Sequence, residues 1–157
     1  MEIGVKFMIV KKAGTILLNL ENKQIGIVYR KDRNDYSFPK GHLENNENLL
    51  ECAVRETEEE TLRANHLLIN KEIDILKYTT SLNENVEVYM YISVDDGPTN
   101  KNIPIKDQEI LQWTNLANVE NLLSYDNLKE FWMEIKETIN DILESNGILS
   151  PAIFTDA

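Results

Sequence analysis

The sequence predicts an α/β or α+β sandwich in which helices cover a mixed β-sheet. Three observations carry this prediction: strand-like runs come first, an acidic helix follows, and a second group of strands precedes a long C-terminal helix. This order gives each apolar face another element to pack against. Of the 157 residues 42% are hydrophobic, enough for one core, so we expect a single domain over residues 1–157.

The first third of the chain has strand character. Three short apolar or β-branched runs lie there, at residues 5–10, 15–20 and 24–30. Gly14 and the polar stretch 21–23 separate these runs. We therefore expect three strands joined by turns.

A helix is expected to follow over residues 49–62. Asn48 is a good N-cap, and Glu51 stands three residues later, in the capping-box position. Strand character then returns at residues 73–78 and 86–94. In the second of these, apolar residues alternate strictly with Glu, Tyr and Ser, so one face is expected in the core and the other carries tyrosines.

The last third is expected to hold a short strand at residues 110–113 and a short helix at 116–123. Apolar residues then recur at helical spacing, which predicts a long helix over 127–145 that Gly147 can end. Residues 148–157 form a tail whose apolar side chains can dock on the fold or on a second copy. The sequence leaves both a monomer and a homodimer open.

The charge balance excludes some classes of partner. The chain has 27 acidic and 16 basic residues and a formal net charge of -11. Binding to a nucleic-acid backbone depends on basic side chains, so we expect no nucleic-acid partner, and phosphates would need mediating cations. A single cysteine and the lack of both a leader-like start and an apolar run of about 20 residues favour a cytoplasmic protein without membrane contact.

The segment over residues 38–62 carries the chemistry. Glu56, Glu59 and Glu60 stand at i, i+3 and i+4, so their carboxylates share one face of a helix and repel each other unless a cation lies between them. Mg²⁺ and Mn²⁺ prefer such oxygen ligands, whereas Zn²⁺ would favour His and Cys. Gly41 allows a sharp bend that can bring a backbone carbonyl to the metal.

Arg55 follows Glu47 by eight residues, so its guanidinium can hold that carboxylate through two hydrogen bonds. An acidic run such as residues 58–60 is ordinarily only a solvated helix face. The ordered spacing of this segment argues against that simpler interpretation.

This spacing resembles the Nudix box, G-x5-E-x7-R-E-U-x-E-E-x-G-U, where U is a bulky aliphatic residue. Six of its seven fixed residues are present: Gly41, Glu47, Arg55, Glu56, Glu59 and Glu60. A match of this length is specific even for a glutamate-rich chain.

Three positions depart from the box: Thr57 and Arg63 replace aliphatic residues, and Leu62 replaces the last glycine. That glycine normally supports the left-handed residue that ends the helix. Without it, we expect that the helix can run on to Asn65. No implied metal ligand is affected.

The resemblance implies a Nudix-type α/β/α sandwich that hydrolyses a nucleoside diphosphate linked to another group, with Mg²⁺ as cofactor and Mn²⁺ as the alternative. By position, it implies catalytic roles for Glu47, Arg55, Glu56 and Glu59. The implied metal ligands are Glu56, Glu59, Glu60 and the carbonyl of Gly41.

Within the family, the stretches "FPKGHLE" and "RETEEE" look like asymmetrical diadenosine tetraphosphate hydrolases, which would release ATP and AMP. In that group a glutamate outside the box precedes an aromatic residue and a short helix. Glu109, in "QEILQWTNL", is therefore a candidate ligand or base, although a lone glutamate there is equally well a surface residue.

The same similarity suggests four substrate-binding residues. Lys40 and His42 would contact the polyphosphate, and Tyr89 and Tyr125 would sandwich an adenine. Tyrosines on sheets commonly only pack. Two other functions stay open: hydrolysis of another nucleotide (an oxidised or ordinary nucleoside triphosphate, ADP-ribose or a capped RNA end), and nucleotide binding without catalysis.

Overall fold

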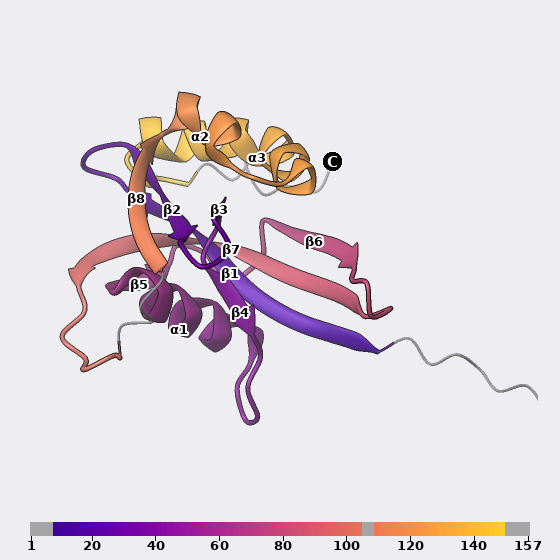
Figure 1. Ribbon diagram of the computed structural model, residues 1–157. Coiled ribbons are helices and arrows are strands. Elements are labelled where there is room, and N and C mark those ends of the chain that lie inside the picture. Colours follow the sequence, from indigo (N-terminus) through magenta and orange to yellow (C-terminus); the bar gives the residue numbers. More distant parts are fainter. Residues whose placement is uncertain (1–7, 105–108, 150–157) are drawn as a thin grey trace, which may run out of the picture.

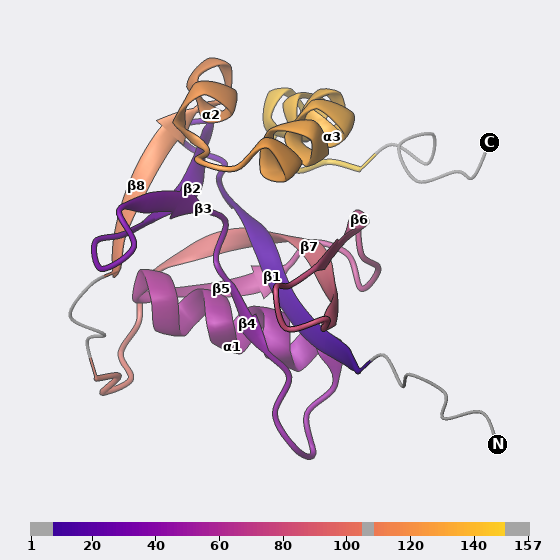
Figure 2. The same ribbon diagram turned by 45° about the vertical axis from the view of Figure 1, so that its right-hand side comes forward.

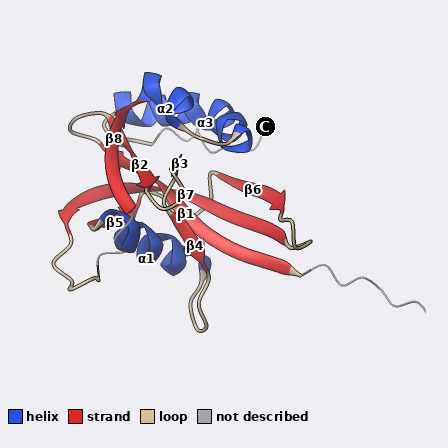
Figure 3. Ribbon diagram, in the orientation of Figure 1, coloured by secondary structure: helices blue, strands red, loops and turns tan. Residues whose placement is uncertain are grey.

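Eight strands form one mixed sheet with helices on both of its faces (Figures 1 and 3). This computed structural model describes residues 8–104 and 109–149. The strands are β1 (Ile9–Asn19), β2 (Gln24–Arg30), β3 (Asp35–Ser37), β4 (Lys40–His42), β5 (Arg63–Leu67), β6 (Asp74–Thr79), β7 (Asn85–Pro98) and β8 (Glu109–Asn115). The helices are α1 (Leu49–Thr61), α2 (Leu116–Leu122) and α3 (Asp126–Glu144).

The sheet has the order β3-β2-β1-β7-β5, and β4, β6 and β8 pair with β1, β7 and β2. The two longest strands, β1 and β7, run parallel, and the other pairs are antiparallel. Helix α1 covers one face, and α2 and α3 cover the other (Figures 1 and 2). The predicted α/β/α sandwich with a mixed sheet is confirmed.

Each face of the sheet has its own apolar cluster. The larger cluster joins β7 residues such as Val88 and Ile92 to the apolar stripe of α3, which includes Phe131 and Trp132. The smaller one packs Ala13, Cys52, Ala53 and Tyr91 beneath α1. The alternation in β7 is therefore real, but its tyrosine face is covered by a helix as well.

The sequence suggested that Gly14 separates two strands, but the structure shows one strand that passes through it. β1 is continuous through it, and residues 5–7 of the predicted first strand lie outside the described residues. A Cβ atom on Gly14 would lie 2.1 Å from the carbonyl oxygen of Pro39. The glycine makes room for the chain that crosses β1, and the neighbouring Thr15 N–H donates to the same oxygen at 3.1 Å.

Three strands were not predicted. β3, β4 and β5 contain three, three and five residues, too few to show an alternating pattern. Each is a strand because it pairs with a longer one: β3 with β2, β4 with β1 and β5 with β7. Tertiary pairing, which local sequence does not reveal, decides their conformation.

Helix α1 begins as predicted. Asn48 Oδ1 accepts from the Glu51 N–H at 2.8 Å, and Glu51 Oε1 accepts from the Asn48 N–H at 3.1 Å, which completes the capping box. The prediction that the helix can run on to Asn65 is wrong. Leu62 itself adopts the left-handed conformation (φ 59°), and Arg63 begins β5.

Helix α3 ends in a Schellman motif. Asn146 and Gly147 both have positive φ, and their N–H groups donate to Leu143 O at 3.2 Å and Ile142 O at 2.8 Å. Gly147 thus takes part in the helix end, with Asn146 as the first left-handed residue. Of the predicted tail, Leu149 packs against the larger core, and 150–157 lie outside the described residues. Among the described helices, none has the length and hydropathy of a membrane-spanning segment.

Candidate functional site

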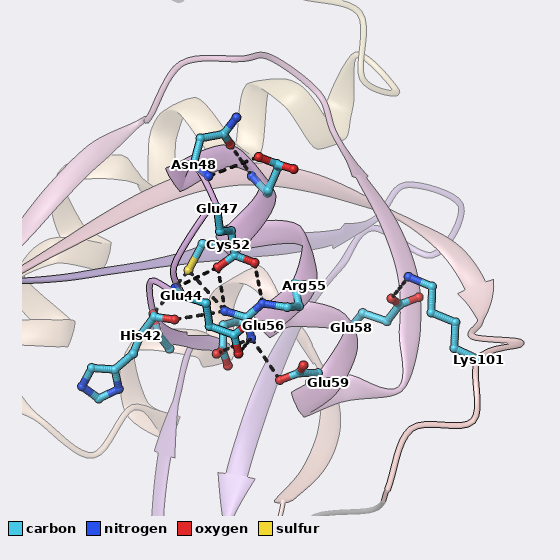
Figure 4. A network of polar contacts seen from close by, with 12 residues as sticks. His42, Glu44, Glu47, Asn48, Cys52, Arg55, Glu56, Glu58, Glu59 and Lys101 are labelled. Carbon is cyan, nitrogen blue, oxygen red and sulfur yellow. Dashed lines mark hydrogen bonds and ion pairs between the residues drawn. The ribbon is translucent and has the colours of Figure 1, made fainter.

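Arg55 stands at the centre of a cluster of carboxylates on the β4 side of α1 (Figure 4). Its Nε lies 2.6 Å from Glu47 Oε2 and its Nη2 lies 2.8 Å from Glu47 Oε1, so the predicted two-bond pairing is confirmed. Its Nη1 binds Glu56 Oε1 at 2.8 Å and Glu59 Oε2 at 3.2 Å. Glu47, in the loop before α1, is thereby joined to two helix carboxylates.

Gly41 brings β4 into contact with this cluster. A Cβ atom there would lie 2.1 Å from the carboxyl carbon of Glu56, so only glycine allows this approach. Close contact, rather than a left-handed bend, explains the glycine, because Gly41 is not among the positive-φ residues of the described chain. The thiol of Cys52 donates to the Gly41 carbonyl at 3.6 Å, and burial, with the charge of Glu47, raises the pKa of that thiol to about 12.

Glu60 and Glu109 form a second pair of neighbouring carboxyl groups. Its Oε1 accepts from the Lys40 N–H at 2.7 Å, and its carboxyl faces that of Glu109 at the start of β8. Burial, and then the charge of Glu109, raises the pKa of Glu60 to about 8, although the Lys40 N–H opposes the shift. The Oε2 atom of Glu109 is buried and, within 8–104 and 109–149, has no hydrogen-bond partner.

These residues suit a hard divalent cation. No group of three or more acidic, His or Cys side chains in the described chain is already arranged around one point, because Arg55 holds Glu56 and Glu59 while Glu60 faces Glu109. The donors are nonetheless carboxylate oxygens, and an orphaned buried carboxylate oxygen beside a second carboxyl is a place where positive charge is needed. The residues that could hold the ion are Glu56, Glu59, Glu60 and Glu109, with the carbonyl of Gly41.

A cavity of about 280 Å³ adjoins this site on the α3 side of the sheet. Lys40 connects the two, because its side chain lines the cavity while its N–H binds Glu60. Burial and the nearby charge of Arg30 lower the pKa of Lys40 to about 8. The lining residues are Lys12, Arg30, Arg33, Lys40, Leu76, Tyr78, Tyr125, Asn127 and Leu128.

Four cationic side chains and no acidic one, among the described residues, line this cavity in a chain of net charge -11. Such a concentration of positive charge attracts phosphate groups. Sequence reasoning found Lys40 and Tyr125 but missed Lys12, Arg30 and Arg33. These residues come from β1, from the end of β2 and from the following turn, and no spacing in the sequence links them.

The structure does not bring the two predicted tyrosines together. Tyr125 lines the cavity. Tyr89 pairs with Ala13, whereas the cavity residue Lys12 pairs with Val88, so Tyr89 projects from the opposite face of the sheet, toward α1. The expected sandwich of one adenine between Tyr89 and Tyr125 does not fit this register.

Tyr78 is the aromatic residue that shares the cavity with Tyr125. His42 pairs with Lys12 across β1 and β4, so it lies on the cavity side of the sheet, but it is not among the residues that line the cavity. Its carbonyl accepts from Arg55 at 3.0 Å, and its ring points away from the Arg55 cluster (Figure 4).

Comparison with known proteins identifies a family model and solved structures that this chain resembles. The family model described as the NUDIX domain matches residues 8–141. No protein of curated function matches the sequence.

Several solved structures share the fold. The Ap4A hydrolase of C. elegans, as a binary complex, is 17% identical with a TM-score of 0.67, over 84% of this chain and 98% of that one. A NUDIX hydrolase from Nitrosomonas europaea is 12% identical with a TM-score of 0.63, over 94% and 97% of the two chains. The MutT protein from Methanosarcina mazei Go1 is 13% identical with a TM-score of 0.60, over 88% and 97%.

Proposed function

The chain belongs to the Nudix family and is a pyrophosphohydrolase of that family, and we propose that its substrate is a dinucleoside polyphosphate, diadenosine tetraphosphate above all. The products would be ATP and AMP. The observation that carries the proposal is the cationic cavity beside the Glu60–Glu109 pair. A cavity with four cationic side chains suits a polyphosphate with several charges better than a single phosphate.

The Arg55 cluster organises the catalytic helix. Arg55 fixes Glu47 to α1 and holds both Glu59 and Glu56, the carboxylate that lies against Gly41. Nudix hydrolases generally use divalent metal ions, and we propose Mg²⁺, with Mn²⁺ as the alternative. When bound, the ion would neutralise phosphate oxygens and lower the pKa of a water molecule.

Glu60 and Glu109 stand where a proton can be held or received. Burial beside a second carboxylate makes Glu60 a stronger base than an ordinary glutamate, so either residue of the pair is a candidate general base. Lys40, Arg30 and Arg33 would bind the polyphosphate. Tyr125 would pack against a base, with Tyr78 as the second aromatic residue of the cavity. The substrate-binding roles of His42 and Tyr89 stay predictions, because neither residue lines the cavity.

Product analysis tests the reaction. Purified protein incubated with Mg²⁺ and diadenosine tetraphosphate should yield ATP and AMP on ion-exchange chromatography. Glu60→Gln should lower kcat by at least about a hundredfold while the melting temperature stays near that of the wild type. Glu58→Gln is the matched control, because Glu58 is buried on the same helix but binds Thr99 and Lys101 instead. Two molecules of ADP as product, or full activity of Glu60→Gln, would contradict the assignment.

A substrate panel decides between the alternatives. kcat/KM should be higher for diadenosine tetraphosphate than for nucleoside triphosphates, oxidised or not, ADP-ribose and capped RNA. A higher value for any of these would replace the proposed substrate but keep the chemistry. Nucleotide binding without metal-stimulated phosphate release would instead identify a non-catalytic binding module.

A further inference from the structure

Asp35 is a buried carboxylate that does not itself line the cationic cavity but contacts residues that do. It opens β3, is 3% exposed, and lies outside the segment that carries the Nudix box. A carboxylate so close to a phosphate-binding cavity weakens the positive potential there, because its charge repels the ligand. Its presence therefore needs a compensating benefit.

Asp35 binds two of the residues that line the cavity. Its Oδ1 and Oδ2 accept from Nε and Nη2 of Arg30, both at 2.7 Å. Its Oδ2 also accepts from the hydroxyl of Tyr125. Burial would raise the pKa of Asp35, but these hydrogen bonds outweigh burial and hold the pKa below its usual value, so the carboxylate stays ionised as an acceptor.

The backbone beside Tyr125 is fixed to the same strand. The Tyr36 N–H donates to Ser124 Oγ at 2.8 Å, and the Ser124 N–H donates to Tyr36 O at 3.2 Å. The corner before α3 is thus attached to β3, and Tyr125, a residue that is 45% exposed, is held at the cavity by the hydrogen bond from its hydroxyl to Asp35. In the described part of the chain, Arg30 keeps one nitrogen, Nη1, without a hydrogen bond, so it can still donate to a phosphate.

We propose that Asp35 is a positioning residue of this cavity, which holds the ring of Tyr125 and the guanidinium of Arg30 where they meet the base and the phosphates of a bound nucleotide. This inference rests on the proposed function of the same site. Side chains that are already fixed lose less conformational entropy on binding, so affinity rises even though the charge of Asp35 opposes it.

A matched pair elsewhere in the molecule gives the control. Arg63 binds Asp95 through the same two nitrogens, at 2.7 and 2.6 Å, and the Asp95 side chain in β7 is 10% exposed, compared with 4% for that of Asp35. Neither residue lines the cavity. Asp95→Ala therefore removes an equivalent ion pair without touching the nucleotide site, and it reports what the loss of such a pair does to stability alone.

The test measures ADP binding by isothermal titration calorimetry, which needs no turnover. Asp35→Ala should raise the Kd for ADP by about tenfold, because two side chains must now be ordered on binding, while Asp95→Ala leaves it unchanged. Steady-state assays with diadenosine tetraphosphate should show the same rise in KM with little change in kcat. Absence of hydrolysis with intact ADP binding would reject the proposed reaction but leave this test valid.

A second variant separates positioning from charge. Asp35→Asn keeps an acceptor for Tyr125 and removes the negative charge, so positioning predicts a Kd between those of the wild type and Asp35→Ala. Tyr125→Phe combined with Asp35→Ala should weaken binding less than the two separate effects predict, because both changes release the same ring. Unchanged or tighter ADP binding by Asp35→Ala, or tighter binding by Asp35→Asn, would overturn the proposal.

Discussion

The carboxyl of Glu60 is governed by opposing local effects. Burial and the charge of Glu109 favour its protonated form, while the N–H of Lys40 favours the carboxylate. The two acidic groups meet only in the folded chain, since one comes from α1 and the other from β8. Without a cation, the folded protein therefore holds a proton here that the unfolded chain releases at lower pH.

This proton makes stability depend on pH. The unfolded carboxyl has a pKa of 4.5, and the folded value is about 8. The folded state thus binds the proton more tightly, so its stability contribution is complete below pH 4.5 and is lost as the pH rises to about 8. In urea unfolding with a chelator, the wild type should lose about 4 kcal/mol more than Glu60→Gln between pH 5 and 8.5.

The control for this measurement is Glu134→Gln, an exposed change on α3, which should follow the wild type. Parallel curves for wild type and Glu60→Gln would show that the folded state does not favour the protonated form of Glu60.

Single residues also show how far the sequence specifies the site. The pairing of Glu47 with Arg55 is predictable, because a fixed spacing on a loop and a helix brings them together. Asp35 and Arg30 are five residues apart in the chain and pair across β2 and β3, but β3 is too short to recognise. The cationic cavity was missed for the same reason: it depends on tertiary pairing.

Among the elements, α1 shows most clearly what local sequence patterns can predict and what they cannot. Its capping box is local and was predicted, whereas its end is set by β5, which pairs with β7 from Arg63 onward. The Leu62 carbonyl accepts from the Thr99 N–H at 2.9 Å, which helps to hold the turn. β1 likewise continues through Gly14 because of contacts with a distant segment rather than its own composition.

The left-handed turn at Leu62 predicts that a Gly variant is more stable than an Ala variant, the reverse of the usual order of stability. Leu62 is partly buried, so either truncation loses apolar contact. Ala keeps the strain of the left-handed conformation (φ 59°), whereas Gly relieves it. In urea unfolding, Leu62→Gly should therefore be more stable than Leu62→Ala by about 1 kcal/mol, although Gly is normally the less stable residue. An Ala variant as stable as the Gly variant would mean that the turn carries no strain.

At the scale of the whole molecule, a chain of net charge -11 brings the carboxyl of Glu60 in α1 beside that of Glu109 in β8. Such repulsion destabilises the folded state until a cation reduces it. Glu60 and Glu109 belong to α1 and β8, so an ion held by both would join a helix to a strand on the neighbouring part of the sheet. The unfolded chain lacks this arrangement, so binding should be coupled to folding.

The melting temperature should therefore rise with divalent cation. A free ion concentration of about 100 times the Kd adds about 2.7 kcal/mol to the stability of a protein that binds the ion only when folded. For a chain of this size, that gain raises the melting temperature by about 5–10 °C. Mg²⁺ or Mn²⁺ should produce this rise in the wild type and in Glu134→Gln, but much less in Glu60→Gln or Glu109→Gln. NaCl at equal ionic strength should give a smaller rise, because it only screens the charges. Equal shifts with NaCl and Mg²⁺, or full shifts in both ligand variants, would show that general screening, rather than a site between α1 and β8, stabilises the protein.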